Sequence, residues 1–218
     1  AEAFMYRYHP QISKVIEIIK DKKIGNLVEM ESYFGLNLME KKILFGIQKK
    51  KKKKEKSRLF DKSLGGGAIL DLGCYPSSMS LLIASLKSNF KDVILKNKSV
   101  EIYKTGVDID ASTKLVFDNE FISFIGTSFK KDLGKKTIIK GDAGEIIIED
   151  SWHGNPSKVV INGKINQIIN IDAKSNIYSY EIEIFSKNFL EKNYEVEYPG
   201  VKFTETFLNM KILDKWLN

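Results

Sequence analysis

The feature that most constrains the fold is a series of short β-rich segments between Asp92 and Asp172, separated by turn signals such as Asn162-Gly163. Asn-Gly is a strong hairpin signal, because both residues tolerate positive φ angles. Consecutive strands with short connections pair with one another, so this region predicts a mainly antiparallel meander. The expected strands are 93–103, 109–117, 121–129, 136–140, 145–149, 159–161 and 165–171.

Helical patterns lie on both sides of this region. Apolar residues at helical spacing predict helices at 10–21, near 178–192 and near 204–217. The apolar face expected on the last helix consists of Phe207, Met210, Leu213 and Leu217. The apolar stretch 68–86 is interrupted by Pro76, which predicts either a kinked helix or two abutting helices with Pro76 in the first turn of the second.

Two further strands are expected before residue 40. The aromatic-rich run 3–8 predicts a short strand. Over 28–38 the side chains alternate, with Val28, Met30 and Phe34 among those on one face, which predicts a half-buried strand. The fold class is therefore α+β, with a large, mainly antiparallel sheet and helices packed on one face.

The net charge of +7 is concentrated in one segment. Ten basic residues and one acid lie between Lys41 and Arg58, which leaves −2 on the rest of the chain. This concentration argues against a broad nucleic-acid-binding face. The run Lys49–Lys54 predicts an exposed, mobile loop within 39–63. A solvated loop, attraction of an anionic substrate such as a phosphorylated or nucleotide-linked sugar, and a nucleic-acid tether all remain open.

Several classes of protein are disfavoured by composition. No apolar run approaches the roughly 20 residues of a membrane span, and no secretory signal is visible at the start. The single cysteine, Cys74, allows no internal disulfide, which fits a cytoplasmic location. Two histidines and one cysteine do not make a plausible zinc site, so no metal is expected. His9 before Pro10 is interpreted as a residue at the start of a helix rather than as a base.

Gly65-Gly66-Gly67 is the one glycine cluster that precedes a helical pattern. It lacks the Gly-x-Gly-x-x-Gly spacing of a dinucleotide-binding turn and follows a charged segment. One interpretation is a flexible start to the helix or a close approach of the backbone. The other is a set of free amides that hold an anion or a polar substrate oxygen.

The run Gly65 to Pro76, Gly-Gly-Gly-Ala-Ile-Leu-Asp-Leu-Gly-Cys-Tyr-Pro, resembles the start of the central helix in the glucose-fructose oxidoreductase / inositol dehydrogenase / MocA family. It is most similar to the branch of dihydrodiol dehydrogenase and NADP-dependent D-xylose dehydrogenase. The opening Glu2 to Gln11 resembles the segment where that family's dinucleotide domain passes to its second domain. Tyr198-Pro199-Gly200 and the following 204–216 are similar to the family's last helix.

The resemblance implies two domain assignments and a function. Residues 1–9 would be the last strand of a dinucleotide-binding Rossmann domain that is otherwise missing, and 10–218 a domain for substrate binding and dimerisation. The protein would oxidise or reduce a sugar, polyol or related cyclic alcohol with NAD or NADP, NADP being favoured. It would form a homodimer through the open face of the sheet, without a membrane or a nucleic acid as partner. The family's catalytic Lys would precede residue 1, so this chain alone is expected to be inactive.

The resemblance also implies site residues. Asp71 and Tyr75, four residues apart, match the family's acid and its Tyr or His that face nicotinamide and substrate, so both are candidate catalytic and substrate-binding residues. A tyrosine can carry a proton if a nearby cation lowers its pKa. Arg58 stands where the branch has a substrate-side Arg, and Arg7 is a candidate for contact with substrate or cofactor. The structural alternatives are a core aromatic for Tyr75, a local hydrogen-bonding acid for Asp71 and a surface ion pair for Arg7.

Two other functions remain open. The chain could be a non-catalytic module that binds a sugar or dimerises, derived from a split or truncated gene. It could also tether a nucleic acid through Lys49–Lys54, which would require salt-dependent binding that is lost with the loop.

Overall fold

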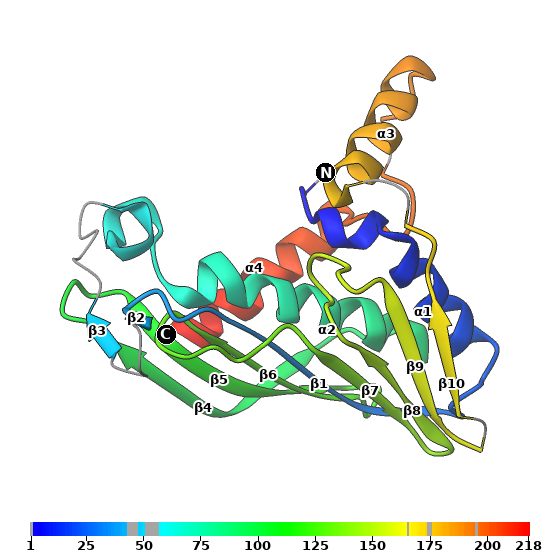
Figure 1. Cartoon of the computed structure of the whole chain (residues 1–218), viewed down its shortest axis with the longest axis horizontal. Helices are drawn as coiled ribbons and strands as arrows, with labels where there is room; N and C mark the ends of the chain where they lie inside the picture. The colour runs from blue at the N-terminus through cyan, green and yellow to red at the C-terminus, as the bar shows by residue number, and fades with distance from the viewer. Residues whose placement is uncertain (1, 43–47, 51–56, 165, 174–175, 195) are drawn as a thin grey trace.

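Eight strands form one sheet in the order β10-β9-β8-β7-β1-β6-β5-β4. The computed structural model describes residues 2–42, 48–50, 57–164, 166–173, 176–194 and 196–218. Helices α1 (Pro10–Lys20), α2 (Cys74–Lys87) and α4 (Phe203–Leu217) lie over one face of the sheet, whereas α3 (Ile177–Leu190) projects away from it beside the N-terminus (Figure 1). The predicted α+β class is confirmed, with α3 as the helix that does not pack on the sheet.

Strand β1 (Leu27–Gly35) lies between two antiparallel meanders. The first meander is β4 (Val93–Ile102), β5 (Asp108–Phe117) and β6 (Ile122–Ser128). The second is β7 (Thr137–Gly141), β8 (Gly144–Ile148), β9 (Lys158–Gly163) and β10 (Gln167–Asn170). Strand β1 pairs antiparallel with β7 and parallel with β6. The seven predicted strands after residue 92 are confirmed, and β1–β6 is the single parallel pair among the described strands.

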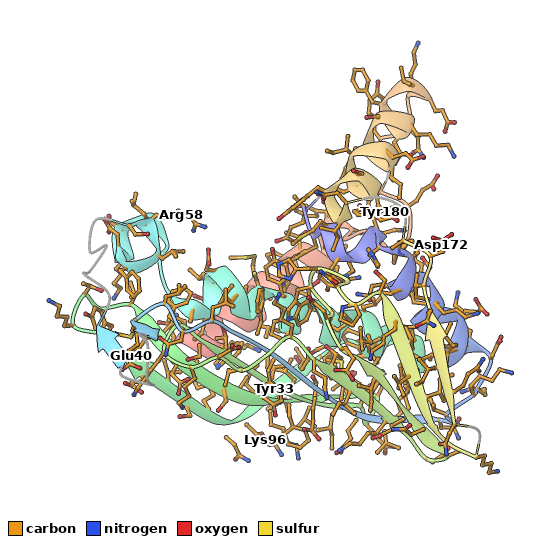
Figure 2. The ribbon with its side chains drawn as sticks, viewed as in Figure 1. Tyr33, Glu40, Arg58, Lys96, Asp172 and Tyr180 are labelled. Carbon is orange, nitrogen blue, oxygen red and sulfur yellow. The ribbon has the colours of Figure 1, made fainter. Side chains whose placement is uncertain are left out.

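The core fills the space between the sheet and the helices that cover it, where side chains gather in Figure 2. In β1 Met30 is fully buried and Glu31 lies half exposed on the opposite, open face. Val28 was expected on the buried face but is 44% exposed. The cause is a bulge, since the pairing of β1 with β7 shifts between Leu27 and Glu29 and turns Val28 outward.

The N-terminal segment is not a strand, and the prediction for residues 3–8 is wrong. Met5–Tyr8 form the 3₁₀ helix η1, and its four side chains are buried. High β-propensity describes side chains that fit a half-buried pleated surface. Here the aromatic side chains are enclosed by other elements, and that packing decides the backbone. The assignment of 1–9 to a dinucleotide-binding domain stays a prediction.

Helix α4 presents a different side to the core than its sequence pattern predicts. Its buried residues are Asn209, Ile212, Leu213 and Trp216. Phe207 and Met210, predicted on the core face, are 56% and 47% exposed. Trp216 determines the orientation: it is fully buried, and a Cβ atom on Gly73 would lie 3.1 Å from its ring. Periodicity alone did not identify this contact, because apolar residues occupy more than one side of the helix.

Residues 39–63 contain more structure than the expected loop. Strands β2 (Glu40–Lys42) and β3 (Gln48–Lys50) form an antiparallel hairpin. Two 3₁₀ turns, η3 (Arg58–Phe60) and η4 (Lys62–Leu64), follow. Of the lysine run, residues 51–54 lie outside the described residues, so the prediction that the run is exposed and mobile is not tested.

One helical stretch, Lys62–Lys87, is long and apolar enough to cross a membrane by length and composition alone. The expectation that no apolar run approaches this length was therefore too narrow. In the fold, 67% of the apolar window is buried. The stretch includes α2, which packs against β1, β6 and α4. Its apolar composition is accounted for by its position in the core.

Candidate functional site

The triple glycine comes directly before the central helix, and the amides of Gly66 and Gly67 already form hydrogen bonds within the chain. Gly66 N–H donates to the carbonyl of Asp61 at 2.9 Å, and Gly67 N–H donates to the carbonyl of Leu59 at 3.0 Å. The interpretation of free amides that hold an anion or substrate oxygen is therefore wrong for these two residues. A Cβ on Gly66 would meet the carbonyl oxygens of Asp61 and Leu59 at 2.8 Å, which confirms the interpretation of a close backbone approach.

Asp108 at the start of β5 caps this helix from a distant part of the chain. Its Oδ2 accepts a hydrogen bond from Ile69 N–H at 2.6 Å, and its side chain is 1% exposed. Gly67 has a φ of +125°, and a Cβ there would overlap Asp108 Oδ1. Burial raises the pKa of Asp108, although hydrogen bonds from Ile69 and Ala68 oppose that rise. Asp108 and Gly67 together fix the position from which the next residues project.

The helix begins as a π-helix, η5 (Ile69–Gly73), and continues as α2 from Cys74. Pro76 lies in the first turn of α2, as predicted, and the backbone stays helical where η5 passes into α2, so the two segments form one continuous helix. Proline has no N–H for the bond to the preceding turn. Turns of π-helix are rare in proteins and are frequently found at functional sites. Asp71 lies in the π-helical part and Tyr75 in the α-helical part.

The structure brings Arg58 and Asp71 together in an ion pair. Arg58 Nη2 donates to Asp71 Oδ1 at 2.7 Å. The Arg58 side chain is 64% exposed and that of Asp71 is 19% exposed. Arg58 begins η3 after Ser57, whose hydroxyl accepts from Leu59 N–H. A carboxylate and an accessible guanidinium held in this way can orient a polar substrate.

Tyr75 lies in an aromatic enclosure. Its ring packs edge-on against three others, with ring centroids 5.3 Å from Phe4, 5.4 Å from Phe34 and 5.7 Å from Trp152. Its hydroxyl donates to the sulfur of Met5 at 3.8 Å, a weak acceptor. The ring is therefore held firmly while the hydroxyl lacks a strong protein partner in the described structure. An oxygen of a substrate could replace the sulfur as that partner.

The surroundings of Tyr75 favour the neutral hydroxyl. Burial raises its pKa, and Cys74, Tyr178 and Asp71 raise it further. None of these neighbours is a cation, although proton transfer near neutral pH was expected to need one. Tyr75 is thus held as the neutral hydroxyl, which can donate a hydrogen bond, and it is poorly suited to releasing its proton.

Tyr178 is a neighbour of Tyr75 that sequence reasoning missed. It lies in the first turn of α3, is 52% exposed, and raises the pKa of Tyr75. Helix α3 contacts η1, which places the first turn of α3 beside the aromatic enclosure. The sequence gives an aromatic residue after the helix cap Asn176, but only the packing of α3 shows its relation to Tyr75.

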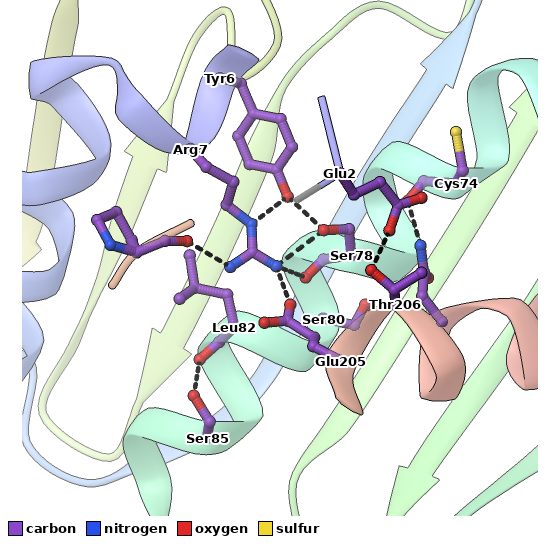
Figure 3. A network of polar contacts seen from close by, with 12 residues as sticks. Glu2, Tyr6, Arg7, Cys74, Ser78, Ser80, Leu82, Ser85, Glu205 and Thr206 are labelled. Atoms are coloured by element: carbon purple, nitrogen blue, oxygen red, sulfur yellow. Dashed lines mark hydrogen bonds and ion pairs between the residues drawn. The ribbon is translucent and has the colours of Figure 1, made fainter. Parts of the chain in front are cut away.

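Arg7 is buried rather than on the surface. Its side chain is 1% exposed, and its guanidinium forms an ion pair with Glu205 (Figure 3). It also donates to the hydroxyl of Tyr6 at 2.9 Å, the carbonyl of Ser78 at 2.7 Å and the carbonyl of Pro199 at 3.1 Å. The alternative of a surface ion pair is corrected to a buried one. Contact with substrate or cofactor would require Arg7 to leave this network.

The two histidines are explained by local structure. His9 precedes α1, and its Nδ1 accepts a hydrogen bond from Gln11 N–H at 3.3 Å, which confirms a residue at the start of a helix. Burial lowers the pKa of His9. His153 N–H donates to Asp150 Oδ1 at 2.9 Å in the turn after β8.

The sequence pattern of the GFO/IDH/MocA C-terminal domain matches residues 12–147, more than half of the chain. The chain belongs to the GFO/IDH/MocA family. Arg58, Asp71 and Tyr75 all lie within the matched part, and the eight-stranded sheet with its central helix is the fold of this GFO/IDH/MocA domain. The resemblance read from Gly65 to Pro76 is confirmed.

Two curated relatives share this domain. Trans-1,2-dihydrobenzene-1,2-diol dehydrogenase from Xenopus tropicalis is 26% identical over 164 residues, which cover 75% of this chain and 43% of the relative. The dTDP-3,4-didehydro-2,6-dideoxy-alpha-D-glucose 3-reductase from Saccharopolyspora spinosa is 23% identical over 153 residues, 69% of this chain and 40% of the relative. The chain thus spans less than half the length of these two proteins.

Solved structures agree on the fold. KijD10, a 3-ketoreductase from Actinomadura kijaniata solved with NADP and TDP-benzene, superposes with a TM-score of 0.78 at 16% identity, over 98% of this chain and 60% of that one. An aldose-aldose oxidoreductase from Caulobacter crescentus, solved with glycerol, has a TM-score of 0.76 at 14% identity, over 98% and 59%. At such identities the likeness shows the fold alone.

Proposed function

We propose that this chain forms the substrate side of an NAD(P)-dependent oxidoreductase that acts on a sugar or a related cyclic alcohol. The observation that carries the proposal is the placement of Asp71, paired with Arg58, and of Tyr75 four residues apart at the start of the central helix. Membership of the GFO/IDH/MocA family supports the reaction class.

The described residues do not fit the phosphates of a dinucleotide. The amides of Gly66 and Gly67 are bonded within the chain, and the Gly-x-Gly-x-x-Gly spacing is absent from the 218 residues. The nicotinamide would supply or accept a hydride, and its binding would depend on other polypeptide. NADP is favoured over NAD, since KijD10 was solved with NADP.

The chain's own residues would orient the substrate and move a proton. Asp71 would accept a hydrogen bond from a substrate hydroxyl, and the bond from Arg58 would hold the carboxylate in place. In the reductive direction the Tyr75 hydroxyl would donate its proton to the carbonyl oxygen of the substrate. Burial raises the pKa of Tyr75, which keeps the hydroxyl protonated but makes it a weaker acid. A cation from outside the described residues would lower this pKa and assist proton transfer in both directions.

The names of similar proteins support a cyclic substrate. They include a dihydrodiol dehydrogenase, a reductase of a dTDP-linked sugar and a 3-ketoreductase solved with TDP-benzene. A nucleotide-linked keto sugar would also suit the cluster of basic residues between Lys41 and Arg58, because its phosphates are anionic.

A homodimer through the open sheet face is part of the proposal. A row of apolar side chains crosses four neighbouring strands there, since Ile138 pairs with Ile147, Ile147 with Val160 and Val160 with Ile168. Ile168 is 65% exposed. A continuous apolar row on an exposed face is typical of an interface.

A non-catalytic sugar-binding or dimerisation module is the second candidate. One observation favours it: none of the groups that most affect the pKa of Tyr75 is a cation. Sugar binding that is indifferent to the presence of nicotinamide dinucleotide would distinguish this module from the oxidoreductase.

The test is a turnover assay on the complete protein that the gene encodes. Sugars, polyols and nucleotide-linked keto sugars are offered with NADPH or NADP⁺, and the absorbance of the reduced nicotinamide is followed. Turnover of at least one cyclic substrate that is lost in Asp71→Asn and Tyr75→Phe supports the oxidoreductase. Sugar binding in calorimetry without any turnover would favour the module.

A further inference from the structure

The buried network around Arg7 joins three parts of the fold that are far apart in sequence. Arg7 belongs to η1, its acceptor Ser78 to α2, and its ion-pair partner Glu205 to α4 (Figure 3). The carbonyl of Pro199 accepts a further bond at 3.1 Å. The guanidinium therefore fixes the spacing between the N-terminal segment and two helices.

Tyr75 is held by two of the elements that this network connects. The residues just before Arg7 contact it directly: the Phe4 ring edge-on and the Met5 sulfur through the Tyr75 hydroxyl. Ser78 lies three residues after Tyr75, on the next turn of α2. A shift of η1 relative to α2 would thus move the enclosure of Tyr75 against the helix that carries it.

The Arg7–Glu205 pair lies in the interior, where removing charges from water has a high free-energy cost. Arg7 is 1% exposed and Glu205 24% exposed in their side chains. Burying two charges costs desolvation that often equals their attraction, so an apolar pair of similar volume can be equally stable. A planar guanidinium differs from apolar groups because its donors have fixed directions. This property suits a network that holds η1, α2 and α4 in fixed positions relative to one another.

We infer that Arg7 and Glu205 are positioning residues for Tyr75, acting through η1 and α2 without touching the substrate. The inference rests on the proposed role of Tyr75 in proton transfer and assigns Arg7 a different role from direct contact with substrate or cofactor. Tyr6 completes the network, because its hydroxyl accepts from Arg7 Nε and donates to Ser78 Oγ at 3.0 Å.

The first test reads the geometry of Tyr75 in this chain by nuclear magnetic resonance. Tyrosine ring carbons are labelled with ¹³C, and the signal of Tyr75 is identified by its loss in Tyr75→Phe. Four neighbouring aromatic rings make its chemical shift sensitive to small displacements. The variants are Arg7→Met and Glu205→Gln. The matched control is Lys140→Met, which removes a cation paired with two carboxylates on the open sheet face.

The expected result is a displaced Tyr75 signal in both network variants and an unchanged signal in the control, with circular dichroism showing an intact fold. If Arg7→Met does not fold, Glu205→Gln still decides, because it keeps the shape of the side chain and removes only its charge. A Tyr75 signal that stays in place in the folded variants overturns the inference.

The second test measures turnover in the complete protein. Arg7→Met should lower kcat by about 10- to 100-fold with little change in KM, because a misplaced catalytic group costs rate through orientation. Arg7→Lys should restore little, since an ammonium group has its three donors on one atom and cannot span the four residues that the guanidinium contacts. Wild-type protein without turnover would contradict the proposed function and leave the resonance test valid. An unchanged kcat in Arg7→Met with a displaced Tyr75 signal would overturn the inferred role.

Discussion

The hydroxyl of Tyr75 lies 3.8 Å from the sulfur of Met5, and this thioether is its only hydrogen-bond partner in the described structure. Removing the hydroxyl as Tyr75→Phe should therefore cost little stability, because the ring keeps its aromatic contacts. In the complete protein it should lower turnover by about 10²-fold or more, as loss of a general acid does. Steady-state kinetics and thermal unfolding on the same preparation check both parts.

Tyr33→Phe is the control for this substitution. Tyr33 lies on β1, and its side chain points to the open face, away from η1 and α2 (Figure 2). Its loss should leave turnover unchanged. If Tyr75→Phe behaves like Tyr33→Phe, then Tyr75 does not carry the proton and is a core aromatic.

The Arg58–Asp71 pair should contribute strongly to kcat/KM and only weakly to the free energy of unfolding. Arg58→Ala should change the free energy of unfolding by less than about 1 kcal/mol, because its side chain is exposed. Asp71→Asn should reduce kcat/KM by about 10- to 100-fold, since a hydrogen bond to a charged group contributes about 1.5–3 kcal/mol. Chemical denaturation and kinetics measure the two effects. A large loss of stability in Arg58→Ala would indicate a structural pair instead.

The start of the central helix should be intolerant of a side chain at Gly67. Gly67→Ala should destabilise the fold by about 3 kcal/mol or more, since a strained φ and a forced overlap each cost about 1–3 kcal/mol. Gly134→Ala is the matched control: its φ is +71°, but a Cβ there would meet no atom within 4 Å. Gly134→Ala should lower the free energy of unfolding by about 1–2 kcal/mol, because only the unfavourable backbone conformation contributes. Equal losses in the two variants would show that the Asp108 contact is unimportant.

Acid should weaken the fold partly through Asp150. Burial opposes its ionisation, but hydrogen bonds from His153 and the charge of Lys135 hold its pKa below the ordinary value. A carboxyl with a depressed folded pKa stabilises above its unfolded pKa of about 4, and that contribution is lost as the pH falls through the folded pKa. The difference in unfolding free energy between wild type and Asp150→Asn should therefore shrink in urea titrations from pH 7 to pH 3. The exposed Glu183→Gln on α3 is the control, and a difference that stays constant with pH would contradict the assignment.

The apolar row on the open sheet face should control association. Ile147→Lys places a charge in the middle of this row, beside Ile138 and Val160. If the face forms a homodimer, the variant should sediment as a monomer at concentrations where wild type is dimeric. Dimers that survive the substitution would place the interface elsewhere.

Sequence patterns predicted the sheet well because its signals are local. Alternation and turn residues gave all seven strands after residue 92, and Asn162-Gly163 marks the connection between β9 and β10. The same reasoning failed for residues 3–8. Aromatic side chains suit a strand, yet here the packing of η1 against α2 and α3 decided the backbone.

Sequence reasoning identified candidate site residues mainly where they lie close together within one motif. Asp71 and Tyr75 lie within one short run, whereas Asp108 and Glu205 come from β5 and α4 to contact Ile69 and Arg7. No local pattern connects these residues, because their proximity results from the folding of the whole chain. Arg7 shows the same limit: its residue type suggested contact with a ligand, and its burial beside Glu205 gives it protein partners instead.

The position of β1 has a consequence for the order of folding. Each meander can assemble from neighbouring hairpins soon after its synthesis, because its contacts are local in sequence. Strand β1 is synthesised before both, yet its partners β6 and β7 come from different meanders. On the ribosome its apolar side chains stay uncovered until β6 has emerged, and its later pairing with β7 is the step that merges the two half-sheets. We expect the slow, aggregation-sensitive phase of folding to depend on this strand.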